Sequence, residues 1–334
     1  MADVNVKIPG LEKLADYVAS GIGAVAGPML APWKASKEAE AKRIAAQADA
    51  DAQITKAKAD ASSLQIIADA QAKARQFLDA PIESGHGTLE INRDSIQQRI
   101  EFQERKRLAN VRSTVKYSAG ELMDKEVPDH EPDPDWTARF FDCIQDVSSE
   151  DMQKIWAKIL YGEVESPGRT SLRTLDTLRN MTKRDAEMFS DVCDFVLGWG
   201  VRFVFDERRY TQHYDALQHF KFIHLQDCGL LHFGQSTQNV TDQSEHIEYQ
   251  GLLLQISRNP KASSKIPFRI ATLTTAGAEL YQITKTQLRM DYLRSFASFL
   301  RSRDCALSYS RIIRKLSDGK IEYYKNFDPI EPAS

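Results

Sequence analysis

The side chains best suited to metal chemistry are four histidines and one cysteine in the C-terminal half: His213, His219, His224, Cys228 and His232. Imidazole and thiolate groups are ligands that zinc prefers, and His224 and Cys228, four residues apart, could share one face of a helix. The surrounding sequence is typical of a hydrophobic helix end, and no second ligand pair at close spacing accompanies them. We therefore expect structural histidines, with no metal and no cofactor.

Known catalytic motifs are missing from the sequence. It contains no P-loop, GxSxG elbow, HExxH motif, CxxC pair, kinase signature or cluster of paired carboxylates. The four cysteines lie far apart, as is typical of reduced thiols in the cytoplasm. The formal net charge of -3 gives no general attraction to nucleic acid. We predict a cytoplasmic protein that is not an enzyme and has no small-molecule substrate.

Three cations define a possible nucleic-acid contact. Arg258, Lys261 and Lys265 lie in "SRNPKASSK", between two predicted strands, where a winged-helix domain would place its wing against phosphates. The sequence "LTTAGAEL" at 273–280 would start the helix after that wing. The expected recognition helix, within 214–228, is not strongly basic, so protein contacts are favoured and DNA binding is the alternative.

A glycine-rich segment near the N-terminus, spanning 1–33 with the helix before it, predicts close packing of apolar surfaces. Its large apolar residues recur in steps of three and four, as on one helix face, and two glycines four residues apart would let two helices approach closely. The segment is either a helix packed inside an oligomer or an interfacial membrane segment. The residues of this segment are Leu14, Val18, Gly21, Ile22, Gly23, Val25, Gly27, Pro28 and Trp33.

Long polar helices are expected over 34–126. The range 34–80 is rich in alanine and charge and has few large apolar residues, so it buries too little to be stable alone and favours self-association. A second helix is predicted over 89–123, with Ile96 and Ile100 among its apolar positions. Its basic "ERKRLANVRSTVK" stretch could meet acidic groups, although such runs usually form a solvated face.

The remainder predicts a four-helix bundle over 127–200, a winged-helix-like domain over 201–290, and a C-terminal helix and β-hairpin over 291–334. The fold class expected overall is mainly α with a small α+β part. Bundle helices are expected to start at caps, and the last of them to run through Phe195. The expected caps are Asp135, Ser148 with Asp151, Ser171 or Thr170, and Thr182 with Asp185. Asp318-Gly319 marks the terminal hairpin.

The stretch "IWAKILYGEVESPGRTSLRTLDTLRNMTKRDAEMF" resembles bacterial abortive-infection alpha (Abi-alpha)-like proteins and a related family of unknown function. "GIGAVAGPMLAPWKA" and "ERKRLANV" are also similar to that group, and the likeness spans roughly 18–290. Each motif residue also has a structural explanation, and Glu163 could pair with Arg169 or Arg173. The motif residues are Trp156, Leu160, Gly162, Glu163, Pro167, Gly168, Ser171, Arg173 and Leu175.

The resemblance implies anti-phage defence by arrest or death of the infected cell, and it supplies no catalytic residues. We therefore expect a self-associating effector or sensor, a homo-oligomer through its N-terminal helices. It would act in the cytoplasm or at the inner face of the membrane, and a phage-derived protein would be its trigger. The alternatives are a DNA-binding regulator and a non-enzymatic scaffold for a partner protein.

Overall fold

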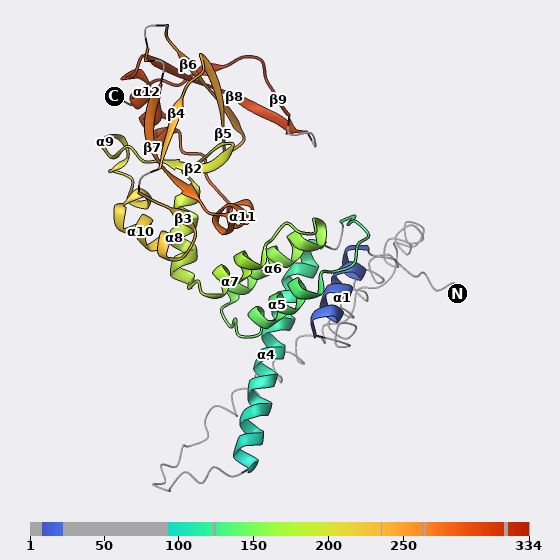
Figure 1. Cartoon of the computed structure of the whole chain (residues 1–334). Helices are drawn as coiled ribbons and strands as arrows, with labels where there is room; N and C mark the ends of the chain where they lie inside the picture. The colour runs from blue at the N-terminus through green and yellow to red at the C-terminus, as the bar shows by residue number, and fades with distance from the viewer. Residues whose placement is uncertain are drawn as a thin grey trace, which may run out of the picture.

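The computed structural model describes residues 9–22, 93–122, 125–234, 236–260, 262–263, 265–316 and 320–333. The predicted polar helix over 34–80, most of the glycine-rich segment and the Asp318-Gly319 turn lie outside the described residues. Element labels follow Figure 1. Helices form the middle of the molecule, a sheet forms one end, and half of one long helix extends from the other end (Figure 1).

Six helices described before the sheet form a bundle. The bundle consists of α1 (Pro9–Ile22), α4 (Arg93–Leu122), α5 (Pro134–Ile144), α6 (Glu150–Glu165), α7 (Leu172–Arg179) and α8 (Lys183–Cys193). Aromatic side chains fill its core: the Trp136 ring stacks on Phe140 at 5.0 Å, and Trp156 meets Phe140 edge-on at 5.6 Å. Aromatic side chains of α5 and α6 therefore form the centre of the bundle core.

The helix starts test the cap predictions individually. Ser171 caps α7, and Thr182 with Asp185 forms the complete capping box predicted for α8. Asp133, and not Asp135, caps α5, because Pro134 occupies the first helical position, where proline is favoured. The predicted pair of Ser148 and Asp151 is also wrong, because α6 begins after Ser149, which makes no side-chain cap bond.

The C-terminal half forms a ten-stranded antiparallel sheet within the described residues. Its strands are β1 (Val196–Trp199), β2 (Val201–Phe205), β3 (Leu231–His232), β4 (Thr237–Val240), β5 (Ser244–Tyr249), β6 (Leu252–Arg258), β7 (Ile266–Leu273), β8 (Cys305–Lys315), β9 (Ile321–Tyr323) and β10 (Asp328–Pro329). Between them lie α9 (Arg208–Thr211), a 3₁₀ turn (Asp215–Leu217), α10 (His219–Asp227), α11 (Thr275–Ile283) and α12 (Met290–Arg301). The mainly α fold class is therefore wrong.

Strand pairing overturns the winged-helix prediction. The strands on either side of "SRNPKASSK" exist, but β6 pairs with β5 and β8, whereas β7 pairs with β2, β3 and β4. Two strands that do not pair with each other cannot form a wing. The expected boundary after residue 200 falls in the turn between β1 and β2, whose residues are hydrogen-bonded partners.

The sheet packs around α12, the predicted amphipathic C-terminal helix. The Phe205 ring on β2 lies 4.7 Å from that of Phe296 on α12, and Tyr292 is fully buried between them and β1. The Tyr292 hydroxyl accepts a hydrogen bond of 2.8 Å from the backbone N–H of Phe205. This polar contact fixes the helix against the strand inside an aromatic core.

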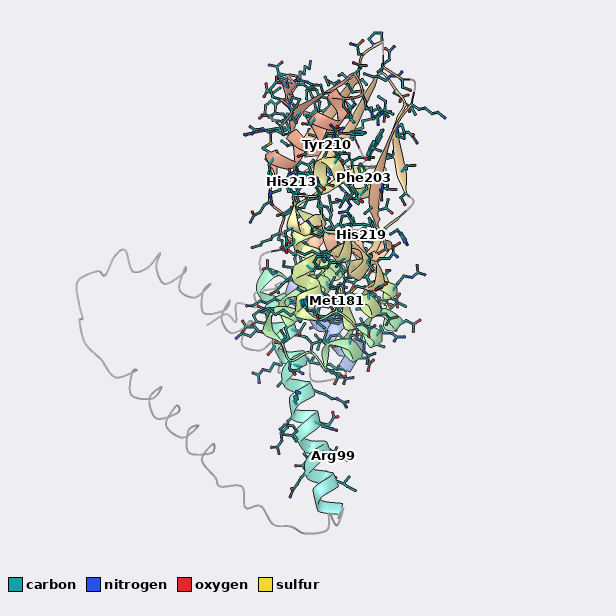
Figure 2. The ribbon with its side chains drawn as sticks, turned by 90° about the vertical axis from the view of Figure 1, so that its left-hand side faces the viewer. Arg99, Met181, Phe203, Tyr210, His213 and His219 are labelled. Carbon is teal, nitrogen blue, oxygen red and sulfur yellow. The ribbon has the colours of Figure 1, made fainter. Side chains whose placement is uncertain are left out.

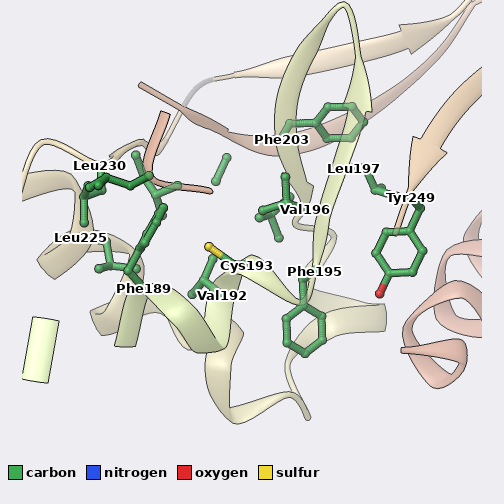
Figure 3. Close-up of a cluster of buried hydrophobic side chains, with 14 of the residues drawn as sticks. Phe189, Val192, Cys193, Phe195, Val196, Leu197, Phe203, Leu225, Leu230 and Tyr249 are labelled. Carbon is green, nitrogen blue, oxygen red and sulfur yellow. The ribbon is translucent and has the colours of Figure 1, made fainter. Parts of the chain in front are cut away.

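The bundle and the sheet meet where α8 passes into β1 (Figure 3). Val192 and Cys193 end the helix, and Phe195 is buried beyond it, just before β1. The prediction that this helix runs through Phe195 is therefore wrong by two residues. Apart from the half-buried Asp194, the residues from Val192 to Leu197 are apolar and buried in both elements, so hydrophobicity alone could not show where the helix ends.

Candidate functional site

The long helix α4 has two halves with different surroundings. Val111, Val115 and Leu122 in its C-terminal half are almost fully buried against the bundle. The Asn110 side-chain amide donates to the Gln145 carbonyl at 2.8 Å, at the point where the helix enters the bundle. Residues 93–109, here called the arm, extend beyond the bundle, and Figure 2 labels Arg99 on this part.

The face of α4 that packs in the bundle continues along the arm. Steps of three and four residues lead from Ser118 through Thr114, Val111, Arg107 and Gln103 to Ile100 and Ile96, and residues so spaced share one helix face. Ser118 and Thr114 are fully buried, whereas Ile100 is 45% exposed and Ile96 is 40% exposed. No described element covers these two isoleucines. The arm therefore presents two exposed isoleucines on the same helix face as the packing residues of α4, with Gln103 and Arg107 between them and the bundle.

Other apolar side chains of the arm point elsewhere. Phe102, 68% exposed, lies about 200° around the helix from Ile100, at about 100° per residue. The basic stretch is partly neutralised within the chain: Arg107 is 3.0 Å from Glu104, and Arg105 is 3.6 Å from Glu101. These contacts fit the expectation of a solvated charged face.

The N-terminal helix α1 packs on its own chain. Leu14 and Val18 are fully buried, and a Cβ at Gly21 would lie 2.0 Å from the Phe141 ring of α5. The close approach that Gly21 permits is therefore with α5, and Ile22 is half-buried beside it. The other predicted members of the oligomer or membrane segment lie outside the described residues: Gly23, Val25, Gly27, Pro28 and Trp33. Among the helices that are described, none combines the length and apolar character needed to cross a membrane.

The residues that carry the Abi-alpha resemblance build the connection between α6 and α7. Trp156 and Leu160 of α6 and Leu175 of α7 are fully buried. Gly168 has a φ of +76°, a left-handed conformation that glycine adopts without strain. The remaining members lie along the same stretch: Gly162 in the last turn of α6, Pro167 in the connection and the exposed Arg173 in α7.

Glu163 closes this connection through backbone contacts. Its Oε1 accepts from the Gly168 N–H at 2.7 Å, and its Oε2 accepts from the Thr170 N–H at 3.1 Å. The predicted ion pair with Arg169 is wrong, because Arg169 pairs with Glu165 at 3.6 Å. Burial raises the pKa of Glu163, but both carboxylate oxygens are already bonded. Glu163 therefore holds the turn and is not a candidate acid or base.

Glu279 joins this connection to the C-terminal half. Its Oε2 accepts from the Ser171 N–H at 2.8 Å and from the Thr174 hydroxyl at 2.6 Å. Glu279 lies on α11, which packs against α7. The first turn of α7 is thus fixed by a carboxylate 105 residues away from Thr174, a contact that no local pattern predicts.

Two cations of the supposed wing are described, at the two ends of the connection between β6 and β7. Arg258 donates through Nη1 to the Ser263 carbonyl at 3.0 Å, within its own loop. Lys265 is exposed just before β7, and Lys261 lies outside the described residues. The nucleic-acid contact was predicted because these three residues would lie on a wing. Since β6 and β7 do not pair with each other, they form no wing, and that reason for the prediction is removed.

The five proposed ligands are separated by the fold. The His213 ring lies 4.0 Å from that of Tyr214, the His219 ring lies 5.0 Å from that of Phe233, and His232 is exposed on β3. His224 and Cys228 stay together on α10, where they meet a residue that the sequence reading did not include. That residue is Asp185 of α8, whose Oδ1 is 2.6 Å from the Nε2 of His224.

An apolar cavity of about 240 Å³ lies between α6, α7, α8 and α11. Leu178, Phe189 and Leu280 line it, and Lys158 lies at its edge. Burial lowers the pKa of Lys158, and its Nζ donates to the Ile283 carbonyl at 2.9 Å, at the end of α11. Because small-molecule pockets usually hold roughly 300–1,000 Å³, this cavity is small for a drug-sized ligand.

Comparison with known proteins gives one match. The model of the family described as "Protein of unknown function (DUF2806)" matches residues 94–297. No curated protein and no solved structure matches the chain. The matched range contains nearly all of α4, the helices from α5 to α8 and the sheet as far as α12, whereas α1 lies outside it. It covers more than half of the sequence. The chain therefore belongs to the DUF2806 family.

Proposed function

We propose that this protein is a non-enzymatic subunit that self-associates through the arm of α4. The observation that carries the proposal is the exposure of Ile96 and Ile100 on the same helix face that is buried within the bundle. A helix face that is apolar beyond its last packing partner has room for another helix. The proposed occupant is the arm of a second copy of this chain.

Helix energetics support this pairing. The arm spans roughly 25 Å at about 1.5 Å per residue, and an isolated helix of this length is marginal in water. Packing by a second copy would stabilise it by removing Ile96 and Ile100 from solvent, with about 25 cal/mol for each Å² of apolar surface buried. An isologous pair is the simplest arrangement, because each copy then supplies the same face to the other.

The direct test is mass photometry of the full chain, over a range of concentrations, beside two matched variants. The double variant Ile96→Asp/Ile100→Asp should be monomeric, because it places charge on the proposed face. Phe102→Asp adds charge to the same helix on a different face and should keep the assembly of the unmodified chain.

Two results would refute the proposal: an unmodified chain that is monomeric throughout, or a double variant that assembles like Phe102→Asp. A monomeric chain would favour the alternative of a scaffold that holds a partner protein, which co-purification from cells would reveal.

For the biological role, we propose an effector or sensor of the abortive-infection type, triggered by a phage-derived protein at the inner face of the cytoplasmic membrane. The support is the residue pattern between Trp156 and Leu175, which resembles Abi-alpha-like proteins, together with the proposed self-association. Expression in a phage-sensitive bacterium should reduce plaque formation, and Ile96→Asp/Ile100→Asp should remove the protection while Phe102→Asp keeps it. Equal protection by both variants would separate defence from assembly through the arm.

A further inference from the structure

We propose that Asp185, His224 and Cys228 bind a zinc ion with an open fourth coordination position, where α8 meets α10. The three potential ligand atoms lie within 4.8 Å of one another. This site is independent of the assembly proposed for the arm, which lies on α4. It adds a metal and a partly solvent-accessible coordination position to a protein for which the sequence predicted neither.

The geometry around His224 favours a shared cation over a relay of hydrogen bonds. The Asp185 Oδ1 is 2.6 Å from Nε2 of His224, and the Cys228 Sγ is 3.8 Å from the same nitrogen. In a nucleophile–histidine–carboxylate relay, the two partners use different ring nitrogens. Here a carboxylate and a thiol both approach Nε2, as ligands of one ion do.

The backbone and a hydrogen-bonded partner hold the three groups in place. His224 and Cys228 are four residues apart, at the end of α10 and at its C-cap. Asp185 is the third residue of α8, and its Oδ2 accepts from the Thr182 N–H at 2.7 Å and hydroxyl at 2.8 Å. One carboxylate oxygen is thus fixed by the capping box, and the other is directed at His224. Such support of a ligand by an outer group is typical of metal sites.

The mixture of donors identifies the metal. Calcium and magnesium prefer oxygen ligands, whereas zinc accepts imidazole, thiolate and carboxylate together. Zinc ligands lie at about 2.0 Å for nitrogen and oxygen and about 2.3 Å for sulfur, so the Asp185–His224 contact would lengthen by less than about 1 Å on binding. Three protein ligands leave a fourth position for water, as in zinc sites that react.

Solvent can reach this fourth position. Cys228 is half-buried and lines a surface depression of about 440 Å³ together with Asp227 and Asn180. The competing explanation is a simple Asp185–His224 hydrogen bond between two helices, in which Cys228 has no part. That difference defines the experiment.

The experiment is a zinc titration of the metal-free full chain against a chromophoric chelator, with cobalt as a spectroscopic substitute. One zinc per chain is expected, with a thiolate-to-cobalt charge-transfer band. Cys228→Ser should remove that band and weaken zinc binding by more than the roughly 100-fold that loss of an outer-shell partner can cost. His219→Gln is the matched control, because His219 lies on the same helix and its ring meets that of Phe233 edge-on, away from the three ligands.

His224→Gln should also abolish binding, but it breaks the contact between α8 and α10 and could unfold that region. Cys228→Ser avoids this difficulty, because it removes one atom's chemistry at a half-buried position and leaves the Asp185–His224 contact in place. The proposal is overturned if the unmodified chain takes up no stoichiometric zinc, or if Cys228→Ser binds zinc as tightly as the unmodified chain. A cobalt complex without the thiolate band would equally exclude the site.

Discussion

Leu14→Ala tests whether α1 packs on the bundle of its own chain or is available for another contact. Leu14 is 0% exposed, in the contact of α1 with the bundle. The substitution removes three carbons, with a transfer cost of about 0.8 kcal/mol each, or roughly 2.4 kcal/mol. The cavity left behind adds to this, so we expect the free energy of unfolding to fall by about 3–5 kcal/mol.

The assay is guanidinium unfolding of the full chain, followed by tryptophan fluorescence. Trp136 and Trp156 lie in the bundle core and report on the part that contains α1. The matched control is Leu172→Ala, the same substitution at a residue of α7 that is 42% exposed. We expect it to cost less than about 1 kcal/mol, because little apolar surface is lost and no closed cavity forms.

Equal small effects of the two substitutions would refute the docking of α1 on its own bundle. The helix would then be available as the membrane or oligomer segment that its apolar face first suggested. Amide exchange distinguishes the cases directly: a docked α1 should be protected in the unmodified chain and lose protection in Leu14→Ala. Binding of Leu14→Ala to liposomes should match that of the unmodified chain if Leu14 acts only within the bundle.

Two further substitutions, Tyr292→Phe and Asp291→Asn, test contacts at the start of α12. Tyr292→Phe leaves the Phe205 N–H without its hydrogen-bond partner in an aromatic core, so it should lower the free energy of unfolding by about 1–3 kcal/mol. The control is Tyr324→Phe, at a side chain that is 60% exposed, which should be neutral in the same denaturation assay. The hydrogen bond from Arg289 lowers the pKa of Asp291 in the folded chain. The carboxylate therefore stabilises the fold when the pH is above the ordinary pKa of 3.8, and this stabilisation is lost as the pH falls through the lowered pKa. Asp291→Asn should therefore reduce the melting temperature at neutral pH, and its difference from the unmodified chain should vanish once the pH falls below the lowered pKa of Asp291. A difference that stays constant over this range of pH would contradict the ion pair.

Local signals predicted two of the four expected helix caps. Ser171 and Thr182 cap α7 and α8 as expected, and the helix end at Gly229, with a φ of +75°, follows from the preference for glycine in the left-handed position. Each of these features depends on residues within one turn of one another. Such information is present in the sequence whatever the rest of the chain does.

The sheet could not be predicted in the same way. The strands β6 and β7 are consecutive and were correctly predicted as strands, but the assumption that they pair with each other produced the wrong domain. Their partners are β5 and β8 in one case and β2, β3 and β4 in the other. Pairing between strands depends on contacts distant in the sequence, and short strands such as β1 and β4 give little signal of their own.

In each candidate site, the sequence shows the local part and not the contact between distant residues. The spacing of Ile96 and Ile100 is visible in the sequence, but whether that face is covered depends on where α6 ends its contact with α4. His224 and Cys228 are recognisable as a pair on a helix. Asp185 lies 39 residues before His224, and the sequence indicates only its capping role. One of its carboxylate oxygens forms the cap, and the other contacts His224, which the sequence does not show.

The family-like motif shows why sequence resemblance and function need not coincide in this chain. Glu163 bonds the backbone of its own turn, and Ser171 bonds Glu279 of α11, so the motif fixes the bundle against the helix that follows β7. A motif conserving such a joint would be shared by proteins with the same architecture, whatever each of them binds. Residues that distinguish this chain should therefore lie away from the joint, on the uncovered face of the arm and at the contact between α8 and α10. Substitutions on the arm or at the contact between α8 and α10 should change self-association or zinc binding with little effect on the free energy of unfolding. Substitutions at the joint between α6, α7 and α11 should change both together.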